Sequence, residues 1–236
     1  MKVIQVVGSS GSGKTTFIQE LAKKLKSTGK TGTIKHLGHH SFILEEGKDT
    51  TVHYRTGVSA TIGIDDEKSV ATIRCNSIEG GLSLLSDLGL DYAIIEGFKK
   101  IDLPCIVIGD LETPSCIIRN PQVEDVIANL DGFADYYTVQ GLVNGINPGH
   151  SIITGSISMK EVPGYMDYDL PDKIFSEIES IILQLPGVVD ARCRLSKKSI
   201  VQNEDKLLLA FSVDDINDSA GVLSKAISFI EETLAR

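Results

Sequence analysis

A phosphate-loop motif near the start of the chain constrains the fold more than any other sequence feature. Gly8-Ser9-Ser10-Gly11-Ser12-Gly13-Lys14-Thr15 matches G-x-x-x-x-G-K-T at every fixed position. An apolar run over 3–7 precedes the motif, and a helical pattern of apolar residues over 15–27 follows it. A strand, a loop and a helix in this order are the context in which the motif binds phosphate. The chain is therefore expected to contain an α/β domain that binds a nucleoside triphosphate.

The residue types of the motif explain how such a loop holds phosphate. Glycines allow the backbone to wrap so that successive N–H groups converge on phosphate oxygens, and the following helix directs its positive dipole end at the anion. Lys14 is expected to reach the β- and γ-phosphates. The hydroxyl of Thr15 is expected to bind Mg²⁺.

A second magnesium ligand is expected at the end of a neighbouring buried strand. Glu96 follows the predicted strand 91–95 and precedes Gly97, which makes it the first candidate. Asp49, in Gly47-Lys48-Asp49-Thr50, is the second candidate. Neither N-K-x-D nor T-K-x-D occurs in the chain, so local spacing does not identify the base of the nucleotide.

Histidines cluster after the predicted strand 31–35. His36, His39 and His40 suggest a metal site, because imidazole is the commonest transition-metal ligand. They lie in an expected loop without the H-E-x-x-H pattern of a zinc hydrolase helix, so we favour an anion-contacting or structural role and keep metal binding as the alternative. Lys35 is either a second lysine beside the phosphate or a solvated strand end.

The pattern of apolar runs divides the chain into two parts. In the first part, β-branched runs alternate with helical patterns, which predicts an α/β fold with a mostly parallel sheet flanked by helices. Turn-forming residues concentrate over 143–150 and predict a boundary between a phosphate-loop domain, 1–147, and a small α+β domain, 148–236. Expected strands cover 3–7, 31–35, 91–95, 105–108, 151–157, 188–195 and 207–213, with an antiparallel hairpin over 59–64 and 69–74. Expected helices cover 15–27, 82–88, 123–134, 171–185 and 219–234.

Composition excludes several functional classes. The chain has 23 basic and 32 acidic residues, and the resulting net charge of −9 disfavours binding to long nucleic acid. Apolar runs such as 207–211 fall far short of the ~20 residues that a membrane-spanning helix needs. The 4 cysteines show no C-x-x-C spacing, so we expect reduced thiols and a cytoplasmic protein.

Further motifs follow the phosphate loop in a fixed order. They are Ile34-Lys35-His36, Gly47-Lys48-Asp49-Thr50, Arg55-Thr56-Gly57-Val58 and Ile95-Glu96-Gly97-Phe98-Lys99. Together with the loop, over roughly 1–145, they resemble the family of molybdopterin-guanine dinucleotide biosynthesis protein B (MobB). Thr56-Gly57-Val58 stands where that family usually has Ala-Gly-Ala, which is a mild departure.

The resemblance to MobB implies a P-loop GTP-binding accessory protein, often dimeric, with slow GTP hydrolysis at most. Its implied partner is the molybdenum cofactor guanylyltransferase, which attaches GMP to molybdopterin, with other cofactor-assembly proteins as further partners. Thr15, Asp49 and Glu96 would lie near Mg²⁺. The residues that would hold the phosphates are Gly8, Gly11, Ser12, Gly13, Lys14, Thr15 and Thr16.

The second part is similar to the large subunit of molybdopterin synthase (MoaE). The similarity rests on Pro163-Gly164-Tyr165-Met166, the helix 172–184 and the strands around 191–195 and 207–213. Cys193-Arg194 and Asp218-Ser219 replace two His-Arg pairs of that family, and the chain ends at Arg236 before its lysine-rich catalytic segment. The similarity therefore implies a non-catalytic module that binds a partner or molybdopterin. A basic cluster is either a ligand contact or a solvated turn, and consists of Arg192, Arg194, Lys197 and Lys198.

Two other functions use the same motifs. A small-molecule kinase is possible on this scaffold, but only Arg55, Arg74 and Arg119 are available in residues 1–150 to form an arginine lid over the phosphates. A metal-trafficking GTPase would account for the clustered histidines.

Overall fold

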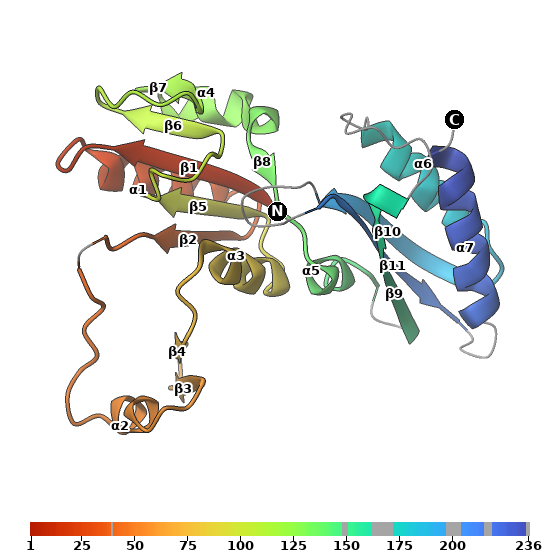
Figure 1. The fold of residues 1–236 in the computed structure, drawn as a ribbon, viewed down its shortest axis with the longest axis horizontal. Coiled ribbons are helices and arrows are strands. Elements are labelled where there is room, and N and C mark those ends of the chain that lie inside the picture. The colour runs from red at the N-terminus through yellow and green to blue at the C-terminus, as the bar shows by residue number, and fades with distance from the viewer. Residues whose placement is uncertain (39, 148–150, 162–171, 197–203, 215–218, 235–236) are drawn as a thin grey trace.

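The computed structural model describes residues 1–38, 40–147, 151–161, 172–196, 204–214 and 219–234. A larger α/β part precedes a smaller part built on an antiparallel sheet (Figure 1). The expected fold class, a mostly parallel sheet flanked by helices with an additional C-terminal α+β unit, is confirmed. Within the described residues, no helix is both long enough and apolar enough to cross a membrane.

The central sheet positions the phosphate loop. Its parallel strands lie in the order β2-β5-β1-β6-β7, and short β8 pairs antiparallel with the start of β1. Because β5 and β2 extend the sheet on one side of β1 and β6 and β7 on the other, the order reverses at β1, which is where open α/β sheets bind ligands. The strands are β1 (Lys2–Gly8), β2 (Thr31–Lys35), β5 (Tyr92–Glu96), β6 (Cys105–Ile108), β7 (Cys116–Arg119) and β8 (Ala134–Asp135).

Alternating side chains of β1 build a core on each face of this sheet. Ile4 and Val6 pack with residues of α1 (Lys14–Leu25) and α4 (Val123–Ala128). Val3 packs on the opposite face with Ile78 and Leu82 of α3 (Ile78–Asp87). Burial on both faces explains why β1 is apolar along most of its length.

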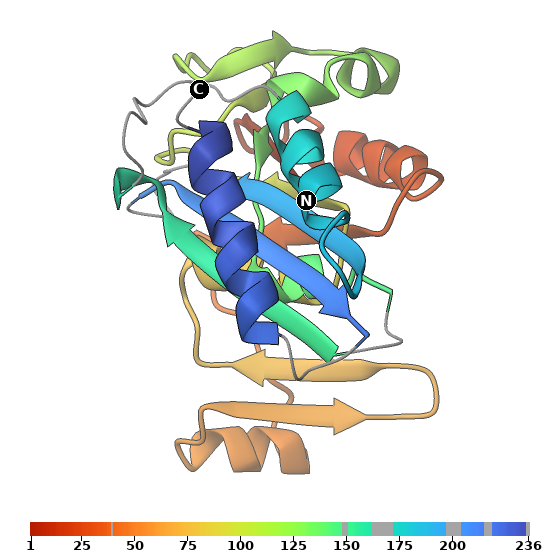
Figure 2. The same cartoon turned by 90° about the vertical axis from the view of Figure 1, so that its right-hand side faces the viewer.

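An arm separates β2 from α3. It contains α2 (Asp49–Arg55) and an antiparallel hairpin of β3 (Ala60–Ile64) and β4 (Ser69–Ile73). Both views show the arm extending away from the central sheet (Figures 1 and 2). The hairpin expected over 59–64 and 69–74 is confirmed.

The C-terminal part packs helices on one face of a sheet in the order β10-β11-β9. Its strands are β9 (Ser151–Ser158), β10 (Val188–Ser196) and β11 (Lys206–Val213), and its helices are α6 (Asp172–Ile182) and α7 (Ser219–Leu234). Figure 2 shows α6 and α7 lying across the sheet. A short 3₁₀ turn, Met159–Glu161, follows β9.

Several expected elements differ from the structure. The helix expected over 123–134 ends at Ala128, because a 3₁₀ turn at Leu130–Gly132 and then β8 return the chain to the sheet. The helix expected over 82–88 begins at Ile78, because the Ser77 hydroxyl accepts the Gly80 N–H and caps it. The sequence analysis missed the short elements α2 and β7.

A further missed element, α5 (Val139–Val143), connects the two parts. Leu142 and Ile146 are buried with Leu208 and Ala210 of β11, on the sheet face opposite α6 and α7. The turn expected over 143–150 follows this helix directly, since α5 ends at Val143 and residues 144–145 lie in a turn. The domain boundary at residue 147 stays a prediction. Leu142 and Ile146 precede that boundary, yet they are buried against β11 of the C-terminal part.

Leu142→Ala should destabilise the protein, because it leaves a cavity between the two parts. Leu142 is 7% exposed, so we expect the free energy of unfolding to fall by about 2–4 kcal/mol in a urea titration. The matched control is Leu88→Ala, at 60% exposure, which should change that free energy by less than about 0.5 kcal/mol. Equal losses in the two variants would contradict the packing role of α5.

Candidate functional site

The phosphate loop joins the carboxyl end of β1 to the first turn of α1. Gly13 has a φ of 91°, in the left-handed region that glycine adopts without strain. Gly8 allows β1 to approach β6 closely, because a Cβ at this position would lie 2.2 Å from the carbonyl oxygen of Ile108. Gly13 therefore allows the turn into α1, and Gly8 allows the close backbone contact between β1 and β6.

Lys14 folds back over the loop, where its Nζ donates a hydrogen bond to the carbonyl oxygen of Ser9. Burial lowers the pKa of Lys14, the negative charge of Glu96 opposes that shift, and Lys99 and Lys35 add to it. The electrostatic surroundings of Lys14 thus contain two further cations and one carboxylate. Such a site gains from an incoming anion, because the lysines repel one another without it.

Glu96 lies where a magnesium ligand was expected. It ends β5 in register with Val6 of β1, and its carboxylate oxygen lies 3.2 Å from Nζ of Lys35. Its side chain is 17% exposed, and its negative charge acts on Lys14 of the phosphate loop. The Lys35 side chain is 54% exposed and pairs with Glu96 at the end of β2, and its contact with a phosphate stays a prediction.

Asp49 lies elsewhere. It is the first residue of α2, in the arm, so a single chain does not bring its carboxylate to the phosphate loop (Figure 1). Thr15 is in the first turn of α1, and its hydroxyl together with Glu96 offers the oxygen donors that Mg²⁺ prefers. These residues fit a magnesium ion without Asp49.

Buried Gln5 organises the turn after β5, a role that the sequence analysis missed. Its amide donates to the carbonyl oxygens of Gly97 at 2.8 Å and Phe98 at 3.0 Å. Gly97 and Phe98 both have positive φ, at 94° and 55°. The Phe98 ring stacks on His36 with centroids 4.5 Å apart. A polar residue inside a buried strand was the signal for this role.

The stacking on Phe98 gives His36 a structural role. His39 lies outside the described residues. In the part of the chain that the structure describes, no group of three or more histidine, cysteine, aspartate and glutamate side chains is placed to hold a metal ion.

The other side of the loop is formed by the segment after β6, which the sequence analysis also missed. The Gly109 N–H donates to Oδ1 of Asn120 at 2.6 Å, and Nη1 of Arg119 donates to the carbonyl oxygens of Gly109 and Leu111 at 3.0 Å each. A Cβ on Gly109 would lie 3.4 Å from Cβ of Ser12, so this segment packs against the phosphate loop. Asn120-Pro121 is an ordinary turn signal in the sequence, so no local pattern indicated that this segment packs against the phosphate loop.

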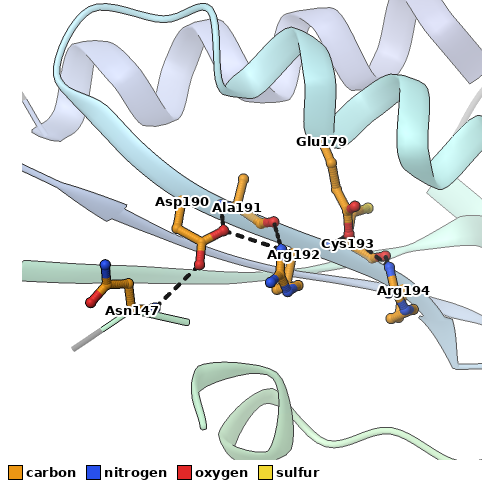
Figure 3. Close-up of polar contacts among 7 residues, drawn as sticks. All are labelled: Asn147, Glu179, Asp190, Ala191, Arg192, Cys193 and Arg194. Carbon is orange, nitrogen blue, oxygen red and sulfur yellow. Dashed lines mark hydrogen bonds and ion pairs between the residues drawn. The ribbon is translucent and has the colours of Figure 1, made fainter. Parts of the chain in front are cut away.

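The basic cluster of the second part has a different environment from the one expected. Nη1 of Arg192 lies 3.1 Å from Asp190, and Nη1 of Arg194 lies 2.7 Å from Glu179 (Figure 3). Lys197 and Lys198 lie outside the described residues. Arg192 and Arg194 are thus each paired with a carboxylate of the same part of the chain.

These ion pairs also seal the free edge of β10. The N–H groups of Ala191 and Cys193 donate to carboxylates of Asp190 and Glu179, each at 2.8 Å. The carbonyl oxygens of the same two residues accept from Arg192 at 3.0 Å and from Arg194 at 2.6 Å (Figure 3). Unpaired edges recruit other strands, so this capping protects the sheet from edge-to-edge pairing. Burial raises the pKa of the Cys193 thiol to about 12, which makes it unreactive.

The sequence pattern of a known family, described as Molybdopterin guanine dinucleotide synthesis protein B, matches residues 3–130. The chain belongs to the MobB family. The match covers the central sheet from β1 to the 3₁₀ turn after α4, including the phosphate loop and Glu96. The resemblance inferred from the motifs is confirmed for MobB, whereas the similarity to MoaE stays a prediction.

Individual MobB relatives match the same region. A molybdopterin-guanine dinucleotide biosynthesis adapter protein of Methanocaldococcus jannaschii is 38% identical over 138 residues, which are 56% of this chain and 58% of that protein. A protein of the same name from Bacillus subtilis is 37% identical over 110 residues, 45% of this chain and 64% of that protein. The chain thus spans about three fifths of the length of these relatives.

Solved structures also match. The crystal structure of Bacillus subtilis MobB aligns with a TM-score of 0.43 at 26% identity, covering 57% of this chain and 99% of that one. A MobB homologue from Bacillus stearothermophilus aligns with a TM-score of 0.37 at 23% identity, covering 56% of this chain and 94% of that one.

Glu179→Ala should open the edge of β10, because it frees the Cys193 N–H and removes the counter-ion of Arg194. We expect the variant to form larger species than the wild type in size-exclusion chromatography with light scattering. The matched control is Glu177→Ala on the same helix, where the carboxylate pairs with Lys173 at 3.4 Å. Identical elution of Glu179→Ala and the wild type would show that the cap does not protect the edge.

Proposed function

We propose that this chain is a GTP-binding accessory protein that assists a guanylyltransferase in attaching GMP to molybdopterin. One structural observation carries the nucleotide part of the proposal: a complete phosphate loop at the reversal point of the sheet, with Lys14, Lys35 and Lys99 around it. The names of the MobB relatives, as adapter proteins, support the accessory role. Other cofactor-assembly proteins are further partners, and the cytoplasm is the proposed compartment.

Each residue of the loop has a proposed role. Lys14 moves from the Ser9 carbonyl to the terminal phosphates, and backbone N–H groups of the loop bind the phosphate oxygens. Thr15 and Glu96 hold Mg²⁺, and Asp49 contributes only if the arm brings it to the site. The phosphate contacts come from Gly8, Gly11, Ser12, Gly13, Lys14, Thr15 and Thr16.

We expect slow GTP hydrolysis at most, because arginine groups that accelerate phosphoryl transfer are engaged elsewhere. Arg119 binds carbonyl groups of the segment after β6, and in the arm Arg55 pairs with Glu46 and Arg74 binds Val58 and Tyr54. An arginine finger contributes about 10³–10⁵ to the rate of related enzymes. These contacts of Arg55, Arg74 and Arg119 also weaken the small-molecule kinase alternative, which needs arginines over the phosphates. The contact of His36 with Phe98 gives no support to the alternative of a metal-trafficking GTPase.

The second part is proposed to be a non-catalytic module that binds a partner protein. Binding of molybdopterin there is the alternative. The pairing of Arg192 with Asp190 and of Arg194 with Glu179 supports the partner protein, because a phosphate at either guanidinium would compete with a carboxylate that is already in place.

Lys14→Ala should weaken GTP binding by more than about 100-fold, because it removes the cation that meets the terminal phosphates. Isothermal titration calorimetry with Mg²⁺ and GTP measures the change. Lys24→Ala, an exposed lysine in the last turn of the same helix, is the matched control and should bind GTP like the wild type. Unchanged affinity in Lys14→Ala would remove the site assignment, and rapid steady-state hydrolysis by the wild type would contradict the accessory role.

A homodimer is proposed because one face of the arm hairpin is uncovered. Ile62 and Ile64 are 61% and 79% exposed and lie on the same face of β3, since side chains alternate along a strand. In the described part of the chain, the hairpin pairs with no third strand. A two-stranded hairpin is marginal alone, so a second copy of the chain is the proposed cover.

The double variant Ile62→Lys with Ile64→Lys should convert the dimer to a monomer, because it places charges in the proposed contact. Light scattering at several protein concentrations measures the mass. Lys68→Glu at the hairpin turn is the control and should leave the mass unchanged. A wild type that is monomeric at all concentrations would overturn the dimer.

A further inference from the structure

Two cysteines lie opposite each other on neighbouring strands of the central sheet. Cys105 begins β6, Cys116 begins β7, and the two residues are partners in the parallel register of these strands. Because β7 is the last strand in the sheet order, the pair lies at the edge of the sheet (Figure 1). The function proposed above uses neither thiol.

Both thiols belong to the same face of the sheet. Cys105 is buried with Val7 and Val107. Cys116 packs against this cluster, whereas Ile106 belongs to the core on the opposite face. Neighbouring strands lie about 4.7–4.9 Å apart, so the Cα atoms of register partners fall within the range of about 4.4–6.8 Å that disulfides span. A disulfide between these two residues therefore needs no change in strand pairing.

Ser115 holds the starts of the two strands in this register. The Cys105 N–H donates to the carbonyl oxygen of Ser115 at 2.9 Å. The Ser115 hydroxyl donates to the carboxylate of Asp102, in the segment that leads into β6. These two hydrogen bonds join residues close to each cysteine, so the two thiols stay neighbours in the folded chain.

The two thiols differ in exposure. Cys105 is 2% exposed, whereas Cys116 is half-buried. Burial raises the pKa of the Cys105 thiol to about 11, and the nearby Cys116 and Asp102 add to the shift. A dissolved oxidant therefore reacts with Cys116 first, and Cys105 is placed to attack the oxidised sulfur from inside the protein.

The other two of the 4 cysteines have different surroundings. Cys193 lies opposite Leu209 in the register of the second sheet. Cys75 is exposed and lies between β4 and α3, outside the central sheet. The pair at the starts of β6 and β7 is therefore the one that strand pairing prepares for a disulfide.

We propose that Cys105 and Cys116 form a reversible disulfide when the protein meets a peroxide. The Cys116 thiolate attacks one peroxide oxygen, which forms a sulfenic acid and releases hydroxide. The Cys105 sulfur then attacks the sulfenic sulfur, so the S–S bond forms as the S–O bond breaks, and the thiol proton leaves with the hydroxyl group as water. In total, the two thiols lose two electrons and two protons, and hydrogen peroxide is reduced to two molecules of water. A small-molecule thiol returns the pair to the reduced state by exchange.

The disulfide would close a ring over residues 105–116. Within that ring, the Ile108 carbonyl lies against Gly8 of the phosphate loop. Gly109 packs against Ser12 of the same loop. Oxidation thus ties the edge strand β7 to the segment that supports the phosphate loop. In a reducing compartment the resting state is the dithiol, in line with the reduced thiols expected from the sequence.

Mass spectrometry of the full chain after treatment with hydrogen peroxide tests the proposal. Trypsin cleaves after lysine and arginine, so residues 101–119 form one peptide that contains both cysteines and no other cysteine. Free thiols are labelled with N-ethylmaleimide in denaturant before digestion. We expect the oxidised peptide to carry no label and to be two hydrogen atoms lighter than the unlabelled reduced peptide. Cys75→Ser, which removes crosslinks through the exposed thiol, should give the same result.

Two single variants test the order of the steps. In Cys105→Ala, Cys116 should remain as a sulfenic acid, which dimedone traps. In Cys116→Ser, Cys105 should keep its thiol, because peroxide does not reach it. Cys193 is the matched buried thiol without a cysteine opposite it, and it should keep its thiol in every sample.

The outcomes decide the proposal in either direction. A peptide 101–119 that keeps both labels while Cys75 is oxidised would overturn the disulfide, as would crosslinks between chains through either cysteine of the pair. Trapping of Cys116 by dimedone to the same extent in the wild type and in Cys105→Ala would show that Cys105 does not attack. If Cys105→Ala does not fold, the wild-type peptide and Cys116→Ser still decide the question. None of these results bears on nucleotide binding, because no step uses a nucleotide.

Discussion

The close contact between β1 and β6 at Gly8 is the constraint on which the rest of the site depends. The backbone of Gly8 packs against the Ile108 carbonyl so closely that no side chain fits between them. This contact fixes the start of the phosphate loop relative to the segment after β6. It also places Ser12 beside Gly109, so the loop and the segment after β6 form one surface. On the other side, the register between Val6 and Glu96 fixes the carboxylate relative to the same loop.

Local charge overrides net charge at this site. The chain carries a net charge of −9, yet burial lowers the pKa of Lys14, and the charges that act on it are Glu96, which opposes the shift, and Lys99 and Lys35, which add to it. Interactions between charges are screened within about 8–10 Å at physiological ionic strength, so the nearest groups decide what an anion meets. An acidic protein can therefore bind a nucleotide well and still avoid long nucleic acid.

The second part of the chain uses its arginines for structure. Each guanidinium binds one carboxylate and one backbone carbonyl along β10, and Asp190 also accepts the Asn147 N–H at 3.2 Å (Figure 3). The opposite face of the sheet is joined to α5 by apolar side chains. These contacts make the second part a protected extension of the MobB unit, with an edge that resists strand pairing.

The sequence by itself determined the phosphate loop, the expected strands and the position of Glu96, because these depend on local patterns of glycine, apolar residues and strand ends. It also indicated the family, since motifs keep their order along a chain. Only the tertiary structure decided that Asp49 lies in the arm, that Arg192 and Arg194 are paired, and that Gln5 and Asn120 shape the two sides of the loop. These features depend on contacts between residues such as Gln5 and Gly97, which are 92 positions apart, and no local pattern specifies such a contact. Helix α5 illustrates the same limit, because its 5 residues are too few to show a helical pattern in the sequence, and Leu142 is buried against β11 only in the folded chain.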